Sequence, residues 1–222
     1  KAKFESQSLF VSIGPVVGKL SASELQEKGV LAQCHVNIVQ LKDDNEFTNY
    51  QSELKYLTED KKRLDTIAEL VLKIKESGNT LILVDRVSAG RQIQTRLSTI
   101  FTKAQLDYEV SFVSGDTNLT ERKENYDEVA TATNKIIIAT YGVAAVGINI
   151  PRIFNLVLLE PGKSFVRVIQ SIGRGIRKAE DKDFVQIWDI TSNCKFAKRH
   201  LTQRKAFYKE ANYPFDLEKL TY

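Results

Sequence analysis

Several residue types are scarce in this 222-residue chain, and methionine is absent altogether. Because the chain begins at Lys1, we expect it to be a fragment of a longer polypeptide. Its two cysteines, Cys34 and Cys194, match no zinc spacing and form no disulfide framework, which favours a reducing compartment such as the cytoplasm. The two histidines, His35 and His200, stand far apart and indicate no metal site. No apolar run is long enough to span a bilayer and no signal-peptide pattern opens the chain, so we expect no membrane partner.

The composition is that of a globular protein, since 42% of the residues are apolar and 27% are charged. The length suits one large α/β domain, or one domain with an appendage. A formal net charge of +4 permits nucleic-acid binding without demonstrating it.

Short, continuous apolar runs separated by segments of helical periodicity dominate the chain after its first third. Continuous runs are typical of strands that are covered on both faces. Their alternation with helices predicts an α/β fold with a parallel sheet and helices on both faces. A further strand is expected at 34–41, and the apolar runs are 80–84, 108–113, 135–139, 153–159 and 184–190.

Three helical features are expected outside these strands. A long helix is predicted from Thr58, as its cap, to Ser77, with Gly78 as its left-handed end. A short helix is predicted at 21–28, and the tail at 193–222 is expected to be helical and to pack on the domain. The basic residues of this tail are interpreted as a solvated helix face, with contact to duplex DNA as the less favoured alternative; they are Lys195, Lys198, Arg199, Arg204 and Lys205.

The run from Gln170 to Arg177 is the most specific motif in the chain. On a helix, Gln170, Arg174 and Arg177 would share one face, because their intervals are close to whole turns. That face would not be buried, since the run holds no acidic partner for the two guanidinium groups. Two planar forks of N–H donors suit a polyphosphate.

Two other segments resemble phosphate loops less closely. Gly162-Lys163-Ser164 follows a strand, but a P-loop would need a glycine where Val157 stands, so Ser164 is interpreted as a helix cap. The segment 140–151 is compatible with a tight loop that contains a short helix from Gly142 to Val146. That explanation leaves Gly147-Ile148-Asn149-Ile150-Pro151 unaccounted for, because this spacing matches no common turn.

Together these motifs resemble the second RecA-like domain of a superfamily-2 helicase. Gln170–Arg177 matches the family signature Q-x-x-G-R-x-x-R, and Ala139-Thr140 with 147–151 resembles its A-T…G-I-D-I-P signature. Leu81–Arg86 resembles the opening strand, and Val113-Ser114-Gly115 resembles the following glycine turn. Order and spacing agree from about residue 65 to 190. Gln170 favours the DNA-translocase branches of the family. The residues Tyr141-Gly142-Val143 and Gln170–Arg174 are similar to those of phage recombination helicases of the UvsW type.

The resemblance implies a role for each signature residue. ATP and Mg²⁺ would bind between two RecA-like domains, with the P-loop and the metal ligands on a preceding domain. Arg174 and Arg177 would be arginine fingers on the γ-phosphate, Gln170 would orient the nucleotide, and Gly147 would let backbone approach it. Asn149 replaces the usual aspartate, so its contact with the nucleotide lacks a charge.

On the nucleic-acid side, the family contacts correspond to Arg86, Ser114, Gly115 and Thr140, which suit sugar and phosphate. Taken singly, each residue favours a structural role: Arg86 a solvated charge, Ser114-Gly115 a turn and Thr140 a strand-end cap. The shared order of the motifs favours the functional interpretation. The implied organisation is a linker at 1–34, a RecA-like domain at 35–192 and an extension at 193–222. The partners would be branched or duplex DNA and the preceding motor domain of the same polypeptide.

Three rival hypotheses remain open. The first is a restriction-type DNA translocase subunit, and the second is a non-catalytic nucleic-acid-binding or annealing module with the same fold. The third is a small phosphate-binding protein that uses Lys163. Our leading prediction is the C-terminal motor domain of an ATP-dependent DNA helicase of recombination, repair or replication, inactive as an ATPase by itself.

Overall fold

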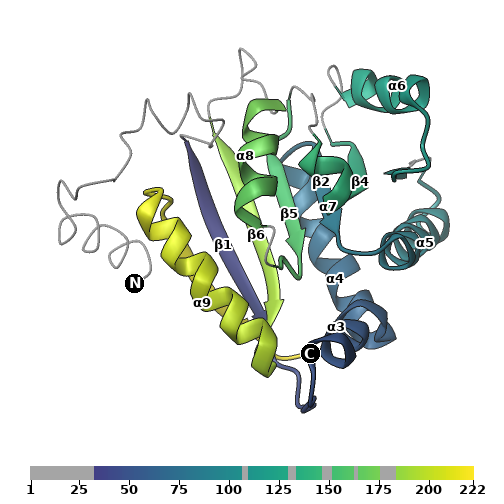
Figure 1. Cartoon of the computed structure of the whole chain (residues 1–222). Coiled ribbons are helices and arrows are strands. Elements are labelled where there is room, and N and C mark those ends of the chain that lie inside the picture. The colour runs from purple at the N-terminus through teal and green to yellow at the C-terminus, as the bar shows by residue number, and fades with distance from the viewer. Residues whose placement is uncertain (1–32, 107–109, 130–133, 147–151, 163–164, 176–183) are drawn as a thin grey trace.

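The protein is described by a computed structural model, which covers residues 33–106, 110–129, 134–146, 152–162, 165–175 and 184–222. Its centre is one seven-stranded sheet of order β3-β4-β2-β5-β6-β1-β7 (Figure 1). Every strand pair is parallel. The strands are β1 (Cys34–Leu41), β2 (Thr80–Val84), β3 (Val110–Val113), β4 (Ile136–Thr140), β5 (Asn155–Leu159), β6 (Val185–Ser192) and β7 (Phe215–Leu220).

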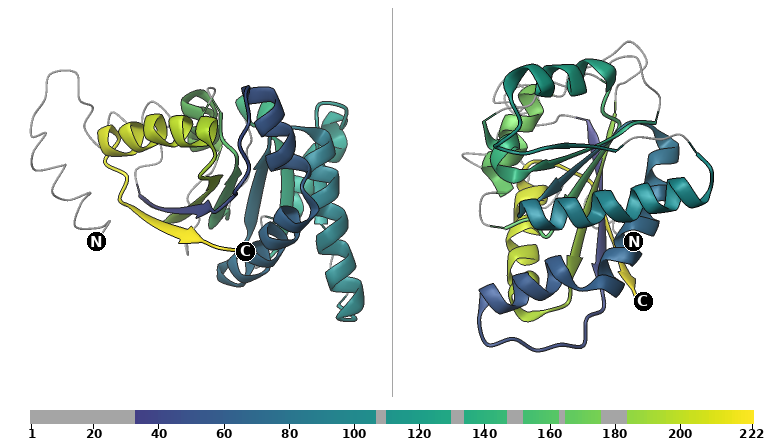
Figure 2. Two further views of the ribbon diagram at one scale, coloured as in Figure 1. Left: turned by 90° about the horizontal axis from the view of Figure 1, so that it is seen from below. Right: turned by 90° about the vertical axis from the view of Figure 1, so that its right-hand side faces the viewer.

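Helices cover both faces of the sheet, as the two turned views show (Figure 2). Side chains of α4 and α5 share one apolar cluster with one set of strand residues. Those of α6, α7, α8 and α9 share a second cluster with the alternate strand residues. The α-helices are α3 (Tyr50–Glu59), α4 (Lys61–Ile74), α5 (Val87–Lys103), α6 (Leu119–Val129), α7 (Tyr141–Ala145), α8 (Phe165–Gly175) and α9 (Lys195–Glu210). The expected α/β sheet with helices on both faces is therefore confirmed.

The expected helix from Thr58 to Ser77 is interrupted. Asp60 has extended backbone angles and caps α4 by accepting a 3.0 Å hydrogen bond from the backbone N–H of Arg63. Thr58 instead lies in the last turn of α3, where its hydroxyl donates to the carbonyl of Leu54. Thr58 as the cap was wrong, because the carboxylate of Asp60 takes that place two residues later. The predicted apolar stripe is buried throughout; its members are Leu64, Ile67, Ala68, Val71 and Ile74.

Gly78 ends this helical segment after a short 3-10 turn at Lys75–Ser77. Its φ of +136° lies in the region that side chains rarely adopt. A Cβ at this position would also lie 2.8 Å from the ring of Phe154. Both the backbone angle and the packing therefore require glycine here, as the sequence predicted for the helix end.

The carboxyl-terminal tail is only partly helical. The expected helix is present as α9, but the chain then forms β7, which pairs in parallel with β1 at the edge of the sheet. His35 and Asp216 join the two strands at 2.8 Å. The sequence analysis missed this strand. Within the parts of the chain that the structure describes, no helix could cross a membrane.

The predicted linker at 1–34 and its helix at 21–28 lie outside the described residues, apart from its last two positions. The same holds for Lys163 and Ser164, so the proposed helix cap at Ser164 stays a prediction.

Candidate functional site

The Gln170–Arg177 signature begins on α8, a crossover helix between two parallel neighbours. It starts beyond the carboxyl end of β5 and leads to the amino-terminal start of β6. Eleven residues span about 16 Å, roughly the length of the strands, so α8 carries the signature from one edge of the sheet to the other. Gln170 is half-buried in the middle of α8, and Arg174 belongs to its last turn. Arg177 lies outside the described residues.

The two helicase-like signatures approach each other where α8 packs on α7. The hydroxyl of Ser171, next to Gln170, donates a 3.0 Å hydrogen bond to the carbonyl of Ala145. Ala145 ends α7, two residues before Gly147. The structure thus brings the helix turn that carries Gln170 against the end of α7, while Gly147 and Asn149 lie outside the described residues.

A buried asparagine anchors the other end of that motif. The Asn79 side chain donates to the carbonyls of Arg152 and Val129, at 3.0 and 3.1 Å, and accepts from the N–H of Lys135 at 2.8 Å. Its backbone carbonyl accepts from Phe154. These contacts fix the segment after Pro151 at the amino-terminal edge of the sheet, the same edge toward which α8 runs.

Asn155 secures the same edge from the start of β5. Its amide donates to the carbonyls of Ile74 and Gly78, and its oxygen accepts from the indole N–H of Trp188 at 3.2 Å. The sequence analysis did not single out Asn79 or Asn155. The available signal was an asparagine at the start of a buried strand, directly before β2 in one case and as the first residue of β5 in the other, where a buried amide needs partners.

The nucleic-acid candidates lie at the opposite edge, where β2, β3 and β4 end. Arg86 follows β2, has 38% of its side chain exposed, and donates to the Gln51 side chain at 3.2 Å. Gly115 follows β3 and is exposed, and a Cβ added to it would meet nothing within 4 Å. An approaching phosphate therefore finds a guanidinium and an unobstructed turn.

The other two candidates at this edge are mostly covered. Ser114 is 3% exposed, and the Arg122 guanidinium donates to its carbonyl at 2.9 Å and to that of Gly115 at 3.2 Å. Thr140 caps α7, because its hydroxyl accepts from the N–H of Val143 at 3.3 Å. The turn at Ser114 and the cap at Thr140 are thus both present.

The crevice in which open α/β sheets usually bind ligands is filled in this protein. β2 and β5 are neighbours whose following helices, α5 and α8, cover opposite faces, and this switch point is the usual ligand site. The fully buried Arg63 enters it from α4, pairs with Glu160 and donates to Asp43 at 3.3 Å. The cavity that remains beside Asp85 and Glu160 has a volume of only about 10 Å³. A ligand the size of a nucleotide does not fit into this cavity as the structure describes it.

Burial shifts the pKa values of the charged groups in this crevice. Desolvation raises the pKa of the Glu160 carboxyl to about 7, although the Arg63 guanidinium lowers it. For Arg63, burial lowers the pKa, but Glu160 and Asp43 together raise it above its ordinary value. Glu160 also has a positive φ of +46°, which turns the chain sharply out of β5.

A second buried arginine secures α9 on the sheet. Arg204 binds both carboxylate oxygens of Asp189, at 2.8 and 2.9 Å, and donates to the carbonyl of Pro161 at 2.9 Å. The Tyr208 hydroxyl donates to Asp189 at 2.6 Å. The expectation that Arg204 belongs to a solvated face was wrong for this residue, because it is 3% exposed and fully paired.

Among the described residues, no group of three or more His, Cys, Asp or Glu side chains is arranged to hold a metal ion. The polar groups of the site are instead amide, hydroxyl and guanidinium donors. Donors of this kind can bind phosphate and sugar oxygens.

Known proteins resemble this chain over most of its length. The family model of the helicase conserved C-terminal domain matches residues 62–179. The ATP-dependent DNA helicase uvsW of Enterobacteria phage T4 is 28% identical over 207 residues, which cover 90% of this chain and 40% of that protein. A putative helicase 22 of the Sulfolobus islandicus filamentous virus (isolate Iceland/Hveragerdi) is 30% identical over 154 residues, or 68% of this chain and 26% of that protein.

Solved structures share the fold. The crystal structure of T4 UvsW superimposes with a TM-score of 0.71 at 24% identity, over 85% of this chain and 42% of that chain. A putative HsdR subunit of a type I restriction enzyme from Vibrio vulnificus gives a TM-score of 0.63 at 16% identity, over 85% and 37% of the two chains. This chain thus spans less than half the length of these relatives.

Proposed function

Because the chain belongs to the family of helicase conserved C-terminal domains, and its sheet is the RecA-like sheet of superfamily-2 helicases, we propose that it is the second motor domain of an ATP-dependent DNA helicase or translocase. It would act on branched or duplex DNA in recombination, repair or replication. Its partner would be a preceding RecA-like domain of the same polypeptide, which would supply the P-loop and the Mg²⁺ ligands.

The observation that carries this proposal is the division of the candidate residues between two edges of one sheet. The segment after Pro151 is fixed by Asn79 at the amino-terminal edge, toward which the last turn of α8 runs. Arg86 and Gly115 lie at the carboxyl edge. A domain of this kind can bind a nucleotide with one edge and a nucleic-acid strand with the other, and the rigid sheet between them can transmit movement.

At the nucleotide edge, Arg174 and Arg177 would stabilise the negative charge that develops on the transferring γ-phosphoryl group. Arginine suits this role because its planar fork binds two oxygens at once and stays charged. Gln170 would orient the nucleotide, while Gly147 and Asn149 would contact it through backbone and amide groups. ATP with Mg²⁺ would supply the phosphoryl group and its charge neutralisation.

At the other edge, Arg86, Ser114, Gly115 and Thr140 would hold the sugar–phosphate backbone without reading bases. The exposed turn at Gly115 offers backbone amides, and Arg86 offers a partly exposed cation that contacts Gln51 at 3.2 Å and Asp85 at 3.8 Å. The covered hydroxyl of Thr140 would act by positioning α7.

The test compares ATP hydrolysis by this chain with hydrolysis by the longer polypeptide that carries a P-loop. The chain alone should show negligible ATPase. In the longer polypeptide, Arg174→Ala and Arg177→Ala should each lower kcat by about 10³-fold or more, and Arg174→Lys should not restore it.

Arg167→Ala is the matched control, because Arg167 is exposed on the same helix two turns earlier. It should leave ATP hydrolysis within about twofold of the wild type, as surface substitutions outside a site usually do. Substantial ATPase from this chain alone, or full activity of Arg174→Ala, would contradict the two-domain proposal.

A further inference from the structure

Helix α9 begins with positive charges at the end where a helix least tolerates them. Lys195, Lys198 and Arg199 all lie in its first five residues and are exposed. The amino-terminal end of a helix carries partial positive charge, so cations there oppose the macrodipole. No acidic residue follows in α9 until Glu210. The macrodipole therefore does not favour these cations, and a placement against a local rule often marks a functional site.

The backbone amides at this end already have a partner. Glu53 of α3, which is 1% exposed, accepts from the N–H groups of Phe196 and Ala197 at 2.9 and 2.7 Å. An incoming anion cannot use these amides. The donors that stay accessible are the side chains of the three cations, for which the structure gives no ion pair within the described part of the chain.

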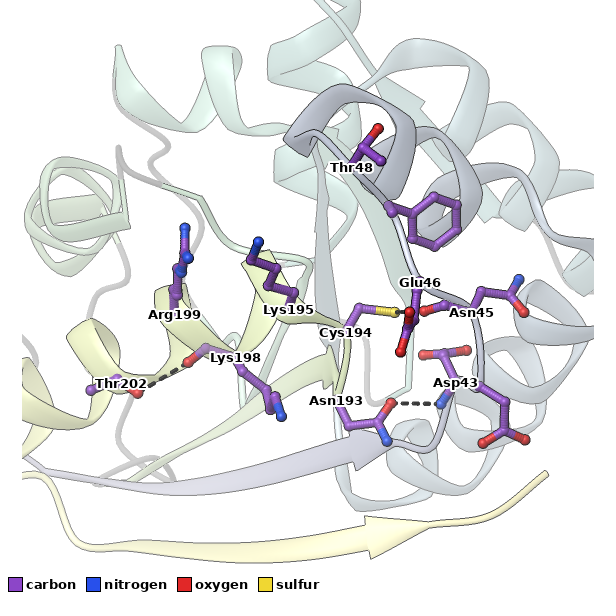
Figure 3. Close-up of a pocket in the computed structure, with 12 residues that line it drawn as sticks. Asp43, Asn45, Glu46, Thr48, Asn193, Cys194, Lys195, Lys198, Arg199 and Thr202 are labelled. Carbon is purple, nitrogen blue, oxygen red and sulfur yellow. Dashed lines mark hydrogen bonds between the residues drawn. The ribbon is translucent and has the colours of Figure 1, made fainter.

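The cations line a cavity of about 900 Å³ between α9 and the 43–48 loop (Figure 3). Lys195 and Arg199 extend to the same side of α9, and Lys198 extends to the other side. The facing wall holds Asp44 and Glu46, so the cavity has one basic wall and one acidic wall. Because like charges repel, the acidic wall disfavours a polyanion deep in the cavity, so a strand bound to these cations would lie on the surface of α9.

Aromatic side chains connect this wall to the nucleic-acid candidates. Phe196 lies under Lys195 and Arg199, each about 5.5 Å from its ring centre, and Tyr50 lies 6.2 Å from Phe196 and 5.1 Å from the ring of His200. Next to Tyr50, Gln51 accepts the hydrogen bond from Arg86. A series of contacts thus leads from the cations of α9 through Phe196 and Tyr50 to the Gln51–Arg86 hydrogen bond. Cations interleaved with aromatic rings are typical of nucleic-acid grooves.

We propose that Lys195, Lys198 and Arg199 form an auxiliary phosphate-binding surface, on which the nucleic-acid strand held at Arg86 continues across Tyr50 and Phe196 onto α9. The proposal rests on the proposed function and extends its nucleic-acid track from β2 to β6 and α9. It assigns to α9 the role of a second contact with the phosphates of the strand. These three residues are exposed, as the sequence interpretation of a solvated face predicts, and the proposal adds a ligand to that face.

The test measures binding of the protein to fluorescent single-stranded and duplex DNA oligonucleotides by anisotropy, as a function of salt. The variant Lys195→Gln/Lys198→Gln/Arg199→Gln should flatten the slope of log K against log salt by about 2–3 and lower affinity at 0.1 M salt about tenfold or more. The control Lys73→Gln/Lys103→Gln/Lys123→Gln removes the same charge from exposed positions on α4, α5 and α6. It should change the slope by less than about 1.

Both variants should melt within a few degrees of the wild type, because all six residues are exposed. If wild-type protein binds DNA and the α9 variant behaves like the control, the auxiliary surface is overturned and the proposed function stands. If wild-type protein binds neither oligonucleotide at low salt, the nucleic-acid part of the proposed function fails as well. If the α9 variant loses binding to duplex but not to single-stranded DNA, the auxiliary surface is supported and its ligand is duplex DNA.

Discussion

Two regions at the carboxyl edge of the same sheet differ in whether their charged residues are buried and paired or exposed to solvent. In the ion-pair cluster, formed by Asp43, Arg63, Glu160, Asp189 and Arg204, every member is at most 8% exposed and hydrogen-bonded to another member. In the turn region, formed by Arg86, Ser114, Gly115 and Thr140, the arginine is accessible and weakly held.

The difference lies in solvent and partners rather than in residue type. Both regions contain arginines beside parallel strand ends, but only Arg63 and Arg204 have lost their water and replaced it with carboxylates and carbonyls. A buried pair is costly to break, whereas an exposed pair contributes little and is free to exchange its partner for a ligand. The ion-pair cluster therefore holds the fold together, and the turn region is left for binding.

Removing the cation of the cluster should have the largest effect. Arg63→Met leaves Asp43 and Glu160 buried without their cation and should lower the free energy of unfolding by about 3–5 kcal/mol. Urea unfolding followed by circular dichroism would measure this loss. The matched substitution Arg86→Met in the turn region should cost less than about 1 kcal/mol. Equal losses for the two arginines would remove the distinction between the regions.

The pH dependence should be the next largest effect. The pKa of Glu160 is raised to about 7 in the folded state, against an ordinary value of 4.5. Between these values the folded protein holds a proton that the unfolded chain has released, so stability falls as pH rises from about 4.5 to 7. Relative to Glu160→Gln, the wild type should lose on the order of 3 kcal/mol across this window. Parallel unfolding curves for the two proteins from pH 5 to 8 would contradict this.

A single hydrogen bond of the cluster should matter less. Tyr208→Phe removes the 2.6 Å bond to Asp189 but leaves both bonds from Arg204 in place. We expect a loss of about 1–2 kcal/mol in the free energy of unfolding, because Asp189 keeps its cation but loses a donor. Tyr126→Phe on α6, half-buried in the same chain, is the control and should be close to neutral. A loss of more than about 4 kcal/mol would show that Tyr208 has a wider packing role.

The smallest stability effect should come with a clear effect on binding. Arg86→Gln in the turn region should change the free energy of unfolding by less than about 0.5 kcal/mol. The same substitution should lower affinity for DNA and flatten the salt slope by about 1, as expected for one phosphate contact. Anisotropy titrations at several salt concentrations would measure it. A large loss of stability with unchanged binding would place Arg86 in the structural group instead.

Much of the fold could be predicted because its signal is local. Five continuous apolar runs became β2 to β6, with ends shifted by a few residues. β7 was missed because it is an edge strand that buries only Phe215 fully, and its alternating pattern was short and followed a helix. The helix cap was misplaced at Thr58 because Asp60, two residues later, offers an equally good local signal.

For the candidate site, too, the local signals could be found from sequence and the long-range contacts could not. The Gln170–Arg177 signature could be found from sequence, since its residue types and spacing are specific by themselves. Arg204 was grouped with exposed cations because its partner, Asp189, lies on another element. Asn79 and Asn155 were overlooked because their importance comes from carbonyls that only the folded chain brings to them.

The sequence by itself determined the alternation of strands and helices and the family signatures, because both are encoded in residue types at short separations. Only the tertiary structure decided which cations lose their water, that Arg63 fills the usual ligand crevice, and that α8 runs toward the edge of the sheet opposite Arg86 and Gly115. The physical reason is that desolvation and hydrogen-bond partners depend on neighbours far apart in the chain. Arg63 and Glu160, separated by 97 positions, can meet only after the sheet has assembled.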